Sequence, residues 1–232
     1  MLHVLFNMNK RLKKISEYIE SGIGVIDVGT DHGYLPVHLA QNGYEGNIIA
    51  TDIRPKPLDA ARRSADNAGV SERISFLLCD GLELCPPDKV DTVVIAGMGG
   101  DTICGILDRA EWSWDSRYLH IFQPMTRQYV LRYWLVYNGF EILSETLVKD
   151  KGIIYPVITA RFGSETSLSD GELFVGKYGL VGGEPLFEEY CAQQIKRLES
   201  AVEGLKRSEV EGNSPRLDIM ENILLELKRS KI

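Results

Sequence analysis

The sequence predicts a doubly wound α/β domain over residues 1–163, followed by an antiparallel helical hairpin within residues 164–232. Two observations support the α/β domain. Several short β-branched runs are almost entirely apolar, which is typical of parallel strands that are covered on both faces. Amphipathic stretches separate these runs and often end at a glycine, and this alternation indicates helices on each side of a sheet. A change of texture after Gly163 marks the start of the second part.

The elements of the first part follow in order. The predicted strands are 24–28, 47–52, 73–80, 90–97 and 119–123, and the helices between them are 34–43, 57–69, 101–110 and 126–139. Residues 140–163 hold two further strand patterns joined by the polar tetrapeptide KDKG, so we expect a hairpin at the edge of the sheet. Residues 1–14 place a short apolar run before basic residues, the reverse of a secretion signal, and we interpret them as a frayed start.

The second part begins with a turn-rich stretch, residues 164–184, which lacks periodicity. From residue 185 to about 208, and again over 216–232, apolar residues recur at three- to four-residue steps. This spacing predicts two amphipathic helices that pack against each other. The pattern is compatible both with packing inside the chain and with contact to a partner molecule.

Composition narrows the class of protein. The four cysteines show no CxxC spacing, so we expect reduced thiols in a cytoplasmic protein, with neither a disulfide framework nor a metal site. The sequence contains no run of about 18 apolar residues, so we expect no membrane span. We also expect a monomer. The net charge of −7 argues mildly against nucleic acid, although basic residues gather at 10–14 and at 62–73.

The stretch VIDVGTDHGYLP, residues 25–36, indicates a ligand at the end of the first strand. Gly29 and Gly33 let the backbone approach a ligand closely. A dinucleotide fingerprint would need small residues where Asp31 and Tyr34 stand, and acids there repel phosphates. Asp27 and Asp31 would instead attract a cation. The turn therefore fits the nucleotide turn of methyltransferases, whose donor S-adenosylmethionine carries a sulfonium and an ammonium group.

The ends of three further predicted strands also carry residues that suit this methyl donor. Asp52 comes 23 residues after Gly29, where a carboxylate can accept hydrogen bonds from ribose hydroxyls, although a helix N-cap explains it too. Asp80 could accept from an adenine amino group, and the glycines of AGMGG let a flat group come close. The candidate cofactor-binding residues are Asp27, Gly29, Asp31, Gly33, Tyr34, Asp52, Ile53, Asp80, Gly81, Leu82, Ala96, Gly97 and Met98.

These motifs together resemble the bacterial tRNA (adenine-N1)-methyltransferases of the TrmK type. The resemblance rests on the segments NKRL, DVGTDHGYLP, ATDIRPKPL, CDGL, VIAGMGGDTI and QPMTRQYVLRYWLVYNGFEI, and it extends over nearly the whole chain. It implies a Rossmann-like class I methyltransferase domain that transfers a methyl group from S-adenosylmethionine to N1 of adenosine at nucleotide 22, in the D-arm of tRNA. It also implies that the C-terminal hairpin helps to grip the tRNA.

The sequence patterns are less specific for the residues that would contact the substrate. Asp31 is the first candidate for a catalytic group and His32 the second, although a histidine in a turn often serves as a structural hydrogen bonder. Tyr34 is a candidate to stack on the base, or else packs at the start of a helix. We expect Gly99 to border the base. Basic side chains are candidate phosphate contacts: Arg54, Lys56, Arg62, Arg63, Arg127 and Arg132.

Three other functions stay open at this point. A small-molecule methyltransferase would share the cofactor motifs. A dehydrogenase would share the strand–turn–helix pattern. A noncatalytic RNA-binding protein could use the hairpin alone.

Overall fold

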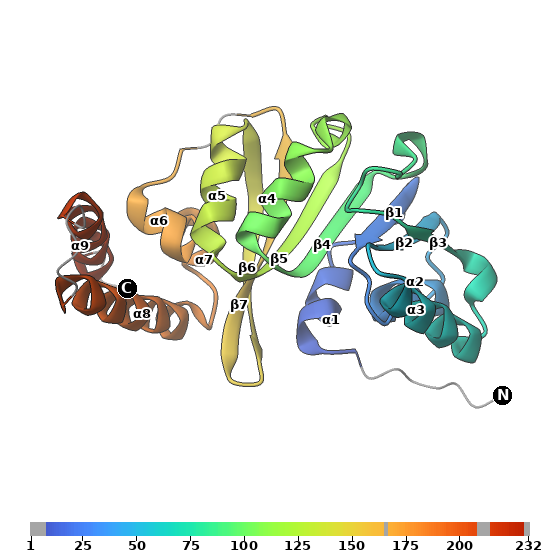
Figure 1. Ribbon diagram of the computed structural model, residues 1–232, viewed down its shortest axis with the longest axis horizontal. Helices are drawn as coiled ribbons and strands as arrows, with labels where there is room; N and C mark the ends of the chain where they lie inside the picture. Colours follow the sequence, from blue (N-terminus) through green and yellow to red (C-terminus); the bar gives the residue numbers. More distant parts are fainter. Residues whose placement is uncertain (1–7, 165–166, 208–213, 230–232) are drawn as a thin grey trace.

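A single seven-stranded sheet spans the first part of the chain (Figure 1). The computed structural model describes residues 8–164, 167–207 and 214–229. The strand order is β3-β2-β1-β4-β5-β7-β6, and the five strands from β3 to β5 are parallel. The strands are β1 (Gly24–Val28), β2 (Asn47–Asp52), β3 (Ile74–Leu78), β4 (Thr92–Gly99), β5 (Leu119–Thr126), β6 (Phe140–Asp150) and β7 (Ile153–Phe162). The antiparallel pair β6–β7 forms the predicted hairpin, with β6 at the edge.

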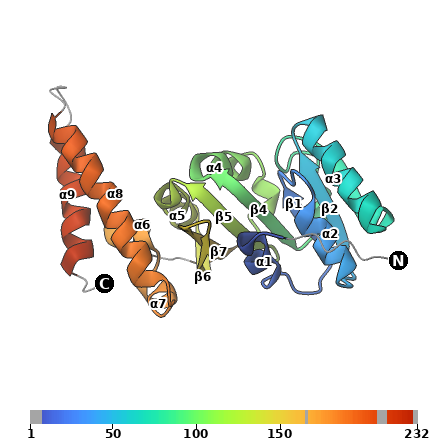
Figure 2. The same cartoon turned by 90° about the horizontal axis from the view of Figure 1, so that it is seen from below.

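Helices cover both faces of the sheet, as the apolar strands require. One face packs against α1 (Lys10–Ser16), α2 (Tyr34–Gln41) and α3 (Pro55–Ala68). The other face packs against α4 (Gly100–Asp108) and α5 (Gln128–Tyr137), and Figure 2 shows α1 and α4 on opposite sides of the sheet. Short 3-10 turns lie at Ser71–Arg73, Pro87–Lys89 and Glu111–Ser113. The predicted α/β fold is therefore confirmed.

The C-terminal helices form the predicted hairpin at the far end of the sheet (Figures 1 and 2). The hairpin consists of α8 (Phe187–Arg207) and α9 (Ser214–Arg229), and the short helices α6 (Asp170–Val175) and α7 (Tyr178–Val181) precede it. Lys206 pairs with Glu221 at 2.6 Å and Lys228 pairs with Glu199 at 2.6 Å, so α8 and α9 run antiparallel. Apolar residues of β6 and β7 join the core of these helices. None of the helices in the described part of the chain is long and apolar enough to cross a membrane.

Two expectations about local structure need correction. Residues 10–14 are not frayed: Asn9 accepts a hydrogen bond from the N–H of Leu12 and caps α1, whose Ile15 is completely buried. The turn-rich stretch holds two short helices, and α6 begins with a capping box between Ser169 and Glu172. Residues 1–7 lie outside the described part. The division of the chain at 163/164 stays a prediction.

A buried ion pair ties the sheet to the C-terminal helices. Arg132 of α5 is fully buried, and its Nε donates to Oε1 of Glu145 on β6 at 2.7 Å. Its Nη1 also donates to the carbonyls of Leu173 and Phe174 in α6. The prediction that Arg132 contacts phosphate is therefore wrong, because the side chain is closed off from any ligand.

Candidate active site

The candidate site lies beyond the carboxyl ends of the parallel strands, where α/β folds bind ligands. Two adjoining cavities meet there, a cleft of about 710 Å³ and a smaller cavity of about 280 Å³. They share Gly29, Asp31, Ala96 and Gly97. Other predicted residues line only one of the two cavities. The cleft is lined by Asp52, Ile53, Arg54, Asp80, Gly81 and Met98, and the smaller cavity is lined by Asp27, His32 and Tyr34.

The turn after β1 has a backbone that few residues tolerate. Gly29, Asp31 and Gly33 all have positive φ, at 71°, 53° and 70°. The φ of Gly29 favours glycine at this position, and a β-carbon there would also lie 2.2 Å from Cε of Met98, so the end of that side chain would have to move. Asp31 adopts the left-handed conformation although it has a side chain, a strain that clusters at functional sites. The turn thus holds an exposed carboxylate over the junction of the two cavities.

Asp27 is a buried acid without a cationic partner. Its Oδ2 accepts a hydrogen bond from Oγ1 of Thr30 at 2.7 Å, and within the described part of the chain it forms no ion pair. Burial raises the pKa of Asp27 to about 6; the Thr30 hydroxyl opposes this shift, and the nearby Asp52 carboxylate adds to it. An uncompensated acid of this kind favours a positively charged ligand.

Asp52 stands at the end of β2 and is 5% exposed. Its Oδ1 accepts from the backbone N–H of Arg54 at 2.9 Å. The N-cap position of α3 belongs to Arg54, so Asp52 bonds this turn without being the N-cap itself. Its other carboxylate oxygen has capacity for further donors such as ribose hydroxyls, and that role stays a prediction.

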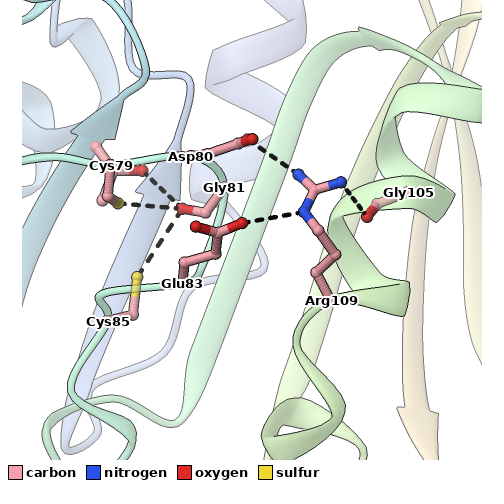
Figure 3. Close-up of polar contacts among 8 residues, drawn as sticks. Cys79, Asp80, Gly81, Glu83, Cys85, Gly105 and Arg109 are labelled. Carbon is pink, nitrogen blue, oxygen red and sulfur yellow. Dashed lines mark hydrogen bonds and ion pairs between the residues drawn. The ribbon is translucent and has the colours of Figure 1, made fainter.

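The loop after β3 is held by an arginine that sequence reasoning missed. Arg109, at the C-terminal end of α4, donates from Nη2 to Asp80 at 2.9 Å and from Nε to Glu83 at 3.2 Å (Figure 3). Its Nη1 donates to the carbonyl of Gly105. An adenine amino group would therefore share the Asp80 carboxylate with a guanidinium. No local signal identifies this contact, because Asp80 and Arg109 are far apart in the sequence.

Two buried thiol groups of the same loop face one backbone carbonyl oxygen. Sγ of Cys79 and Sγ of Cys85 both lie within hydrogen-bonding distance of the Gly81 oxygen, at 3.5 Å and 4.0 Å (Figure 3). The hydrogen bond with Cys85 lowers the pKa of the Cys79 thiol to about 7, while the same contact raises the pKa of Cys85. All four cysteines are buried free thiols, as expected from their spacing.

An irregularity in β4 opens the floor of the site. The register between β4 and β5 shifts between Ala96 and Met98, and Gly97 between them has φ 77°. Nothing lies within 4 Å of the place where a Gly97 β-carbon would stand. Bulges of this type commonly occur next to active sites. The bulge leaves space for a flat group beside the junction of the cavities.

Other predicted residues lie apart from the two cavities or are already in contact with neighbours. Leu82 is 1% exposed in the core, Gly33 packs on Ala61, and Gly99 lies beside Thr126. Arg127 is the N-cap residue of α5 and pairs with Asp101 at 3.1 Å. The rings of His32 and Tyr34 stack at 5.4 Å, and Nε2 of His32 is 3.7 Å from the Asp31 carboxylate. The roles of these residues stay predictions.

A second arginine, Arg11, was not among the candidates. It lines the smaller cavity together with Asn9, although both precede the first strand. The segment NKRL contains these residues, but nothing in its pattern places it against β5 and β6. Among the described residues, no group of three or more His, Cys, Asp or Glu side chains is arranged to hold a metal ion.

Known methyltransferases are similar to this chain over most of its length. A family described as a methyltransferase domain matches residues 8–158. The tRNA (adenine(22)-N(1))-methyltransferase of Bacillus subtilis is 28% identical over 90% of this chain and 91% of its own length.

The chain belongs to the TrmK-type methyltransferase family.

Solved structures of this family extend over nearly the whole chain. The B. subtilis TrmK crystal structure superposes with a TM-score of 0.82 at 28% identity, over 95% of this chain and 98% of that one. A Streptococcus pneumoniae relative, crystallised with S-adenosyl-L-methionine, gives a TM-score of 0.78 at 26% identity over 94% and 99% of the two chains. The likeness includes the C-terminal helices, and the resemblance seen in the sequence is confirmed.

Proposed function

We propose that this protein transfers a methyl group from S-adenosylmethionine to N1 of adenosine at nucleotide 22 of tRNA. The observation that carries the proposal is the Asp27 carboxylate, which is buried without an ion-pair partner among the described residues and lines the smaller cavity beside Gly29 and Gly97. A dinucleotide would bring negative phosphates against Asp27 and Asp31, whereas the sulfonium donor brings positive charge. The relatives named for this reaction share the entire fold.

The residues at the strand ends fit the donor. Asp80 and Asp52 stand at neighbouring strands β3 and β2, in the order that an adenine and its ribose would need. The bare backbone of Gly29 and Gly97 then borders the place where the sulfonium would lie. When bound, the donor supplies an electrophilic methyl group that the N1 lone pair attacks in line, and the bonding electron pair leaves with sulfur.

This chain's residues would mainly align the two reactants. Fixed alignment of this kind can lower a barrier by roughly 7–11 kcal/mol. The target base would lie over the open backbone at Gly97, and Asp31 borders both cavities. Methylation at N1 makes the base cationic, so the exposed Asp31 carboxylate would stabilise the product or accept a proton from N6.

The position of nucleotide 22 sets a further requirement. N1 lies on the pairing edge of adenosine, so the base in the D-arm must open or flip before it reacts, at a cost of about a few kcal/mol. Arg54 borders the cleft with an exposed side chain and is a candidate contact for the displaced strand. The reaction would take place in the cytoplasm and would need no metal, and one chain would suffice.

The test is methylation of an unmodified tRNA transcript, followed by digestion and mass spectrometry to locate the methyl group. We expect 1-methyladenosine at nucleotide 22, and no product when adenosine 22 is replaced by guanosine. Methylation elsewhere would contradict the assigned position. Donor binding with no tRNA product would instead favour a small-molecule methyltransferase, and absence of donor binding would contradict methyl transfer.

A further inference from the structure

The loop that follows β3 brings two cysteines onto a single hydrogen-bond acceptor. Its sequence is CDGLELC, in which Cys79 is the first residue after the strand and Cys85 is the last letter. The backbone turns back between them, because the N–H of Cys85 donates to the carbonyl of Leu82 at 3.1 Å. Figure 3 shows both sulfur atoms directed at the carbonyl oxygen of Gly81. Two residues that are separated in the loop are thus neighbours in space.

The Gly81 oxygen has more donors than it can accept. Oγ1 of Thr51 lies 3.4 Å from this oxygen, Sγ of Cys79 lies 3.5 Å from it and Sγ of Cys85 lies 4.0 Å from it. A carbonyl oxygen has two lone pairs, so three donors compete for them. One thiol can therefore lose its proton while the Gly81 oxygen stays fully hydrogen-bonded.

The two thiols also interact with each other. A hydrogen bond with Cys85 stabilises the thiolate of Cys79 and lowers the pKa of Cys79 to about 7, although burial acts in the opposite direction. The thiolate is the reactive form of cysteine. Burial raises the pKa of the other two cysteines, Cys104 and Cys191, to about 12. The loop therefore combines an activated thiol with a second thiol beside it, as redox-sensitive sites do.

Cys79 is the member of the pair that faces the cleft. It lines the cleft of about 710 Å³ together with Asp80 and Gly81, and Cys85 is not among the lining residues. The two cysteines are only 7% and 6% exposed. A reagent as small as hydrogen peroxide would thus meet Cys79 first, by way of the cleft, and would find Cys85 next to it.

We propose that Cys79 and Cys85 form an oxidation site, at which a peroxide produces a reversible disulfide that closes the adenine end of the cleft to the methyl donor. The effect on the donor rests on the proposed function, whereas the disulfide does not. Bond formation draws the two sulfurs together and removes both thiol donors from the Gly81 oxygen. Asp80 and Gly81 lie within the loop that the disulfide closes, so the contact of Asp80 with an adenine amino group is lost.

Hydrogen peroxide is the oxidant, and it balances the reaction. The Cys79 thiolate attacks one peroxide oxygen, the O–O bond breaks, and the hydroxide that leaves takes up the thiol proton as water. Cys79 is then a sulfenic acid. Sγ of Cys85 attacks the Cys79 sulfur, the S–O bond breaks, and the hydroxide leaves with the Cys85 proton as a second water. The two sulfurs lose two electrons, and the peroxide gains them.

Peptide mapping and calorimetry on one preparation test the proposal. Reduced wild type is treated with hydrogen peroxide, and the excess is removed; one part is denatured, alkylated and digested, and the other is titrated with S-adenosylhomocysteine. We expect a disulfide between Cys79 and Cys85, and an affinity at least about tenfold lower than that of the reduced protein, as for loss of a hydrogen bond to a charged group. Dithiothreitol should restore the affinity.

Two variants locate the reaction. Cys85→Ser keeps a donor for the Gly81 oxygen but removes the second thiol, so peroxide should give no disulfide and leave a sulfenic acid on Cys79, which dimedone traps. Cys191→Ala is the matched control. Cys191 is a buried thiol in the core of the C-terminal helices and lines neither cavity of the site. This variant should form the disulfide and lose affinity as wild type does.

The contrary outcomes can be told apart. Oxidised wild type without a Cys79–Cys85 disulfide would overturn the proposal, and so would a disulfide that leaves the affinity unchanged. A loss of affinity that dithiothreitol does not reverse would indicate oxidation elsewhere in the cleft, such as at Met98, and would also overturn it. If reduced wild type does not bind S-adenosylhomocysteine, the proposed function fails together with the effect on the donor, while peptide mapping still decides whether the disulfide forms.

Discussion

Two buried charge clusters on the same sheet differ in one respect, which is whether the protein itself neutralises them. Arg132 and Glu145 are both fully buried and face each other at 2.7 Å, and backbone groups of the C-terminal segment add hydrogen bonds to both, although Nη2 of Arg132 has no hydrogen-bond partner among the described residues. Asp27 and Asp52 are buried acids at the strand ends, and Asp27 has a hydroxyl as its partner. The charges of Arg132 and Glu145 therefore neutralise each other without a ligand. Asp27 is left for a ligand to neutralise, and Asp52 faces only the exposed guanidinium of Arg54, at 3.9 Å.

The difference identifies which buried charges hold the fold and which prepare a site. A buried ion pair is compatible with a stable fold while both partners are present, and removing one partner lowers the free energy of unfolding. An unpaired acid costs stability in the free protein and is neutralised when a cation binds. Substitutions in the two clusters should therefore have opposite effects on the stability of the free protein.

The largest effect is expected from Arg132→Met. Removing the guanidinium leaves Glu145 charged and buried, which should lower the free energy of unfolding by about 3–5 kcal/mol. Urea denaturation of the variant and wild type measures this change. The double variant Arg132→Met, Glu145→Gln should recover part of the loss; a double variant as unstable as the sum of two singles would contradict the pairing.

Asp27→Asn should act in the opposite direction. The pKa of Asp27 is raised from 3.8 to about 6, so its ionised form destabilises the fold above pH 6, and this cost disappears as pH falls toward 4. The variant should therefore gain about 1–3 kcal/mol at pH 7.5 in the free protein, and little at pH 4. Thermal melts at the two pH values check this; a less stable variant at pH 7.5 would contradict the account.

The affinity for the methyl donor provides a second test of the role of Asp27. A cationic donor favours ionised Asp27, so the affinity of wild type for S-adenosylmethionine should fall as pH drops through about 6. Asp27→Asn should bind the donor more weakly at pH 7.5 and lose most of this pH dependence. Calorimetry from pH 5 to pH 8 measures both. If the affinity of wild type for the donor did not change with pH, the role assigned to the charge of Asp27 would be contradicted.

Asp52→Ala should weaken binding of S-adenosylmethionine by about tenfold or more, since a charge-assisted hydrogen bond to the ribose is lost. The comparison is with Asp59→Ala on α3, an exposed acid outside both cavities, which should bind as wild type does. Calorimetric affinities of the three proteins give the answer. An Asp52 variant with wild-type affinity would take Asp52 out of the cofactor site.

The smallest effect on binding is expected for Asp31→Asn, which should fold normally and reduce turnover on tRNA. Asp31 is exposed and lies between the cavities, so its charge acts mainly on the cationic product. Single-turnover methylation with saturating donor isolates this step. Full activity would remove Asp31 from the candidate catalytic residues, leaving its backbone conformation as its contribution.

The sequence was sufficient for the features that depend on local pattern. Apolar runs and glycine-ended helices predicted the strand–helix alternation, and the acids at successive strand ends predicted that these side chains line cavities at one edge of the sheet. Parallel strands bring such ends together whatever the loops do. The pattern of a capping box at Ser169 is present in the sequence but did not lead to a predicted helix, because the stretch around it lacks helical periodicity.

What the sequence could not predict depends on contacts between distant segments. Arg11 is recognised as part of the site only when α1 is placed against Gln123 and Asp150. Arg109 likewise needs α4 beside the loop after β3. Arg132 was wrongly placed at the surface because a lone arginine in an amphipathic helix is usually exposed, and its partner Glu145 lies on the following strand.

A crystal structure with S-adenosylhomocysteine tests the central claim most directly. The account predicts its ribose on Asp52, its adenine beside Asp80, its sulfur between Gly29 and Gly97, and its amino-acid end in the cavity that Asp27 lines. A ligand bound outside this cleft, or a cleft that stays empty at saturating ligand, would contradict the claim that these acids await a methyl donor.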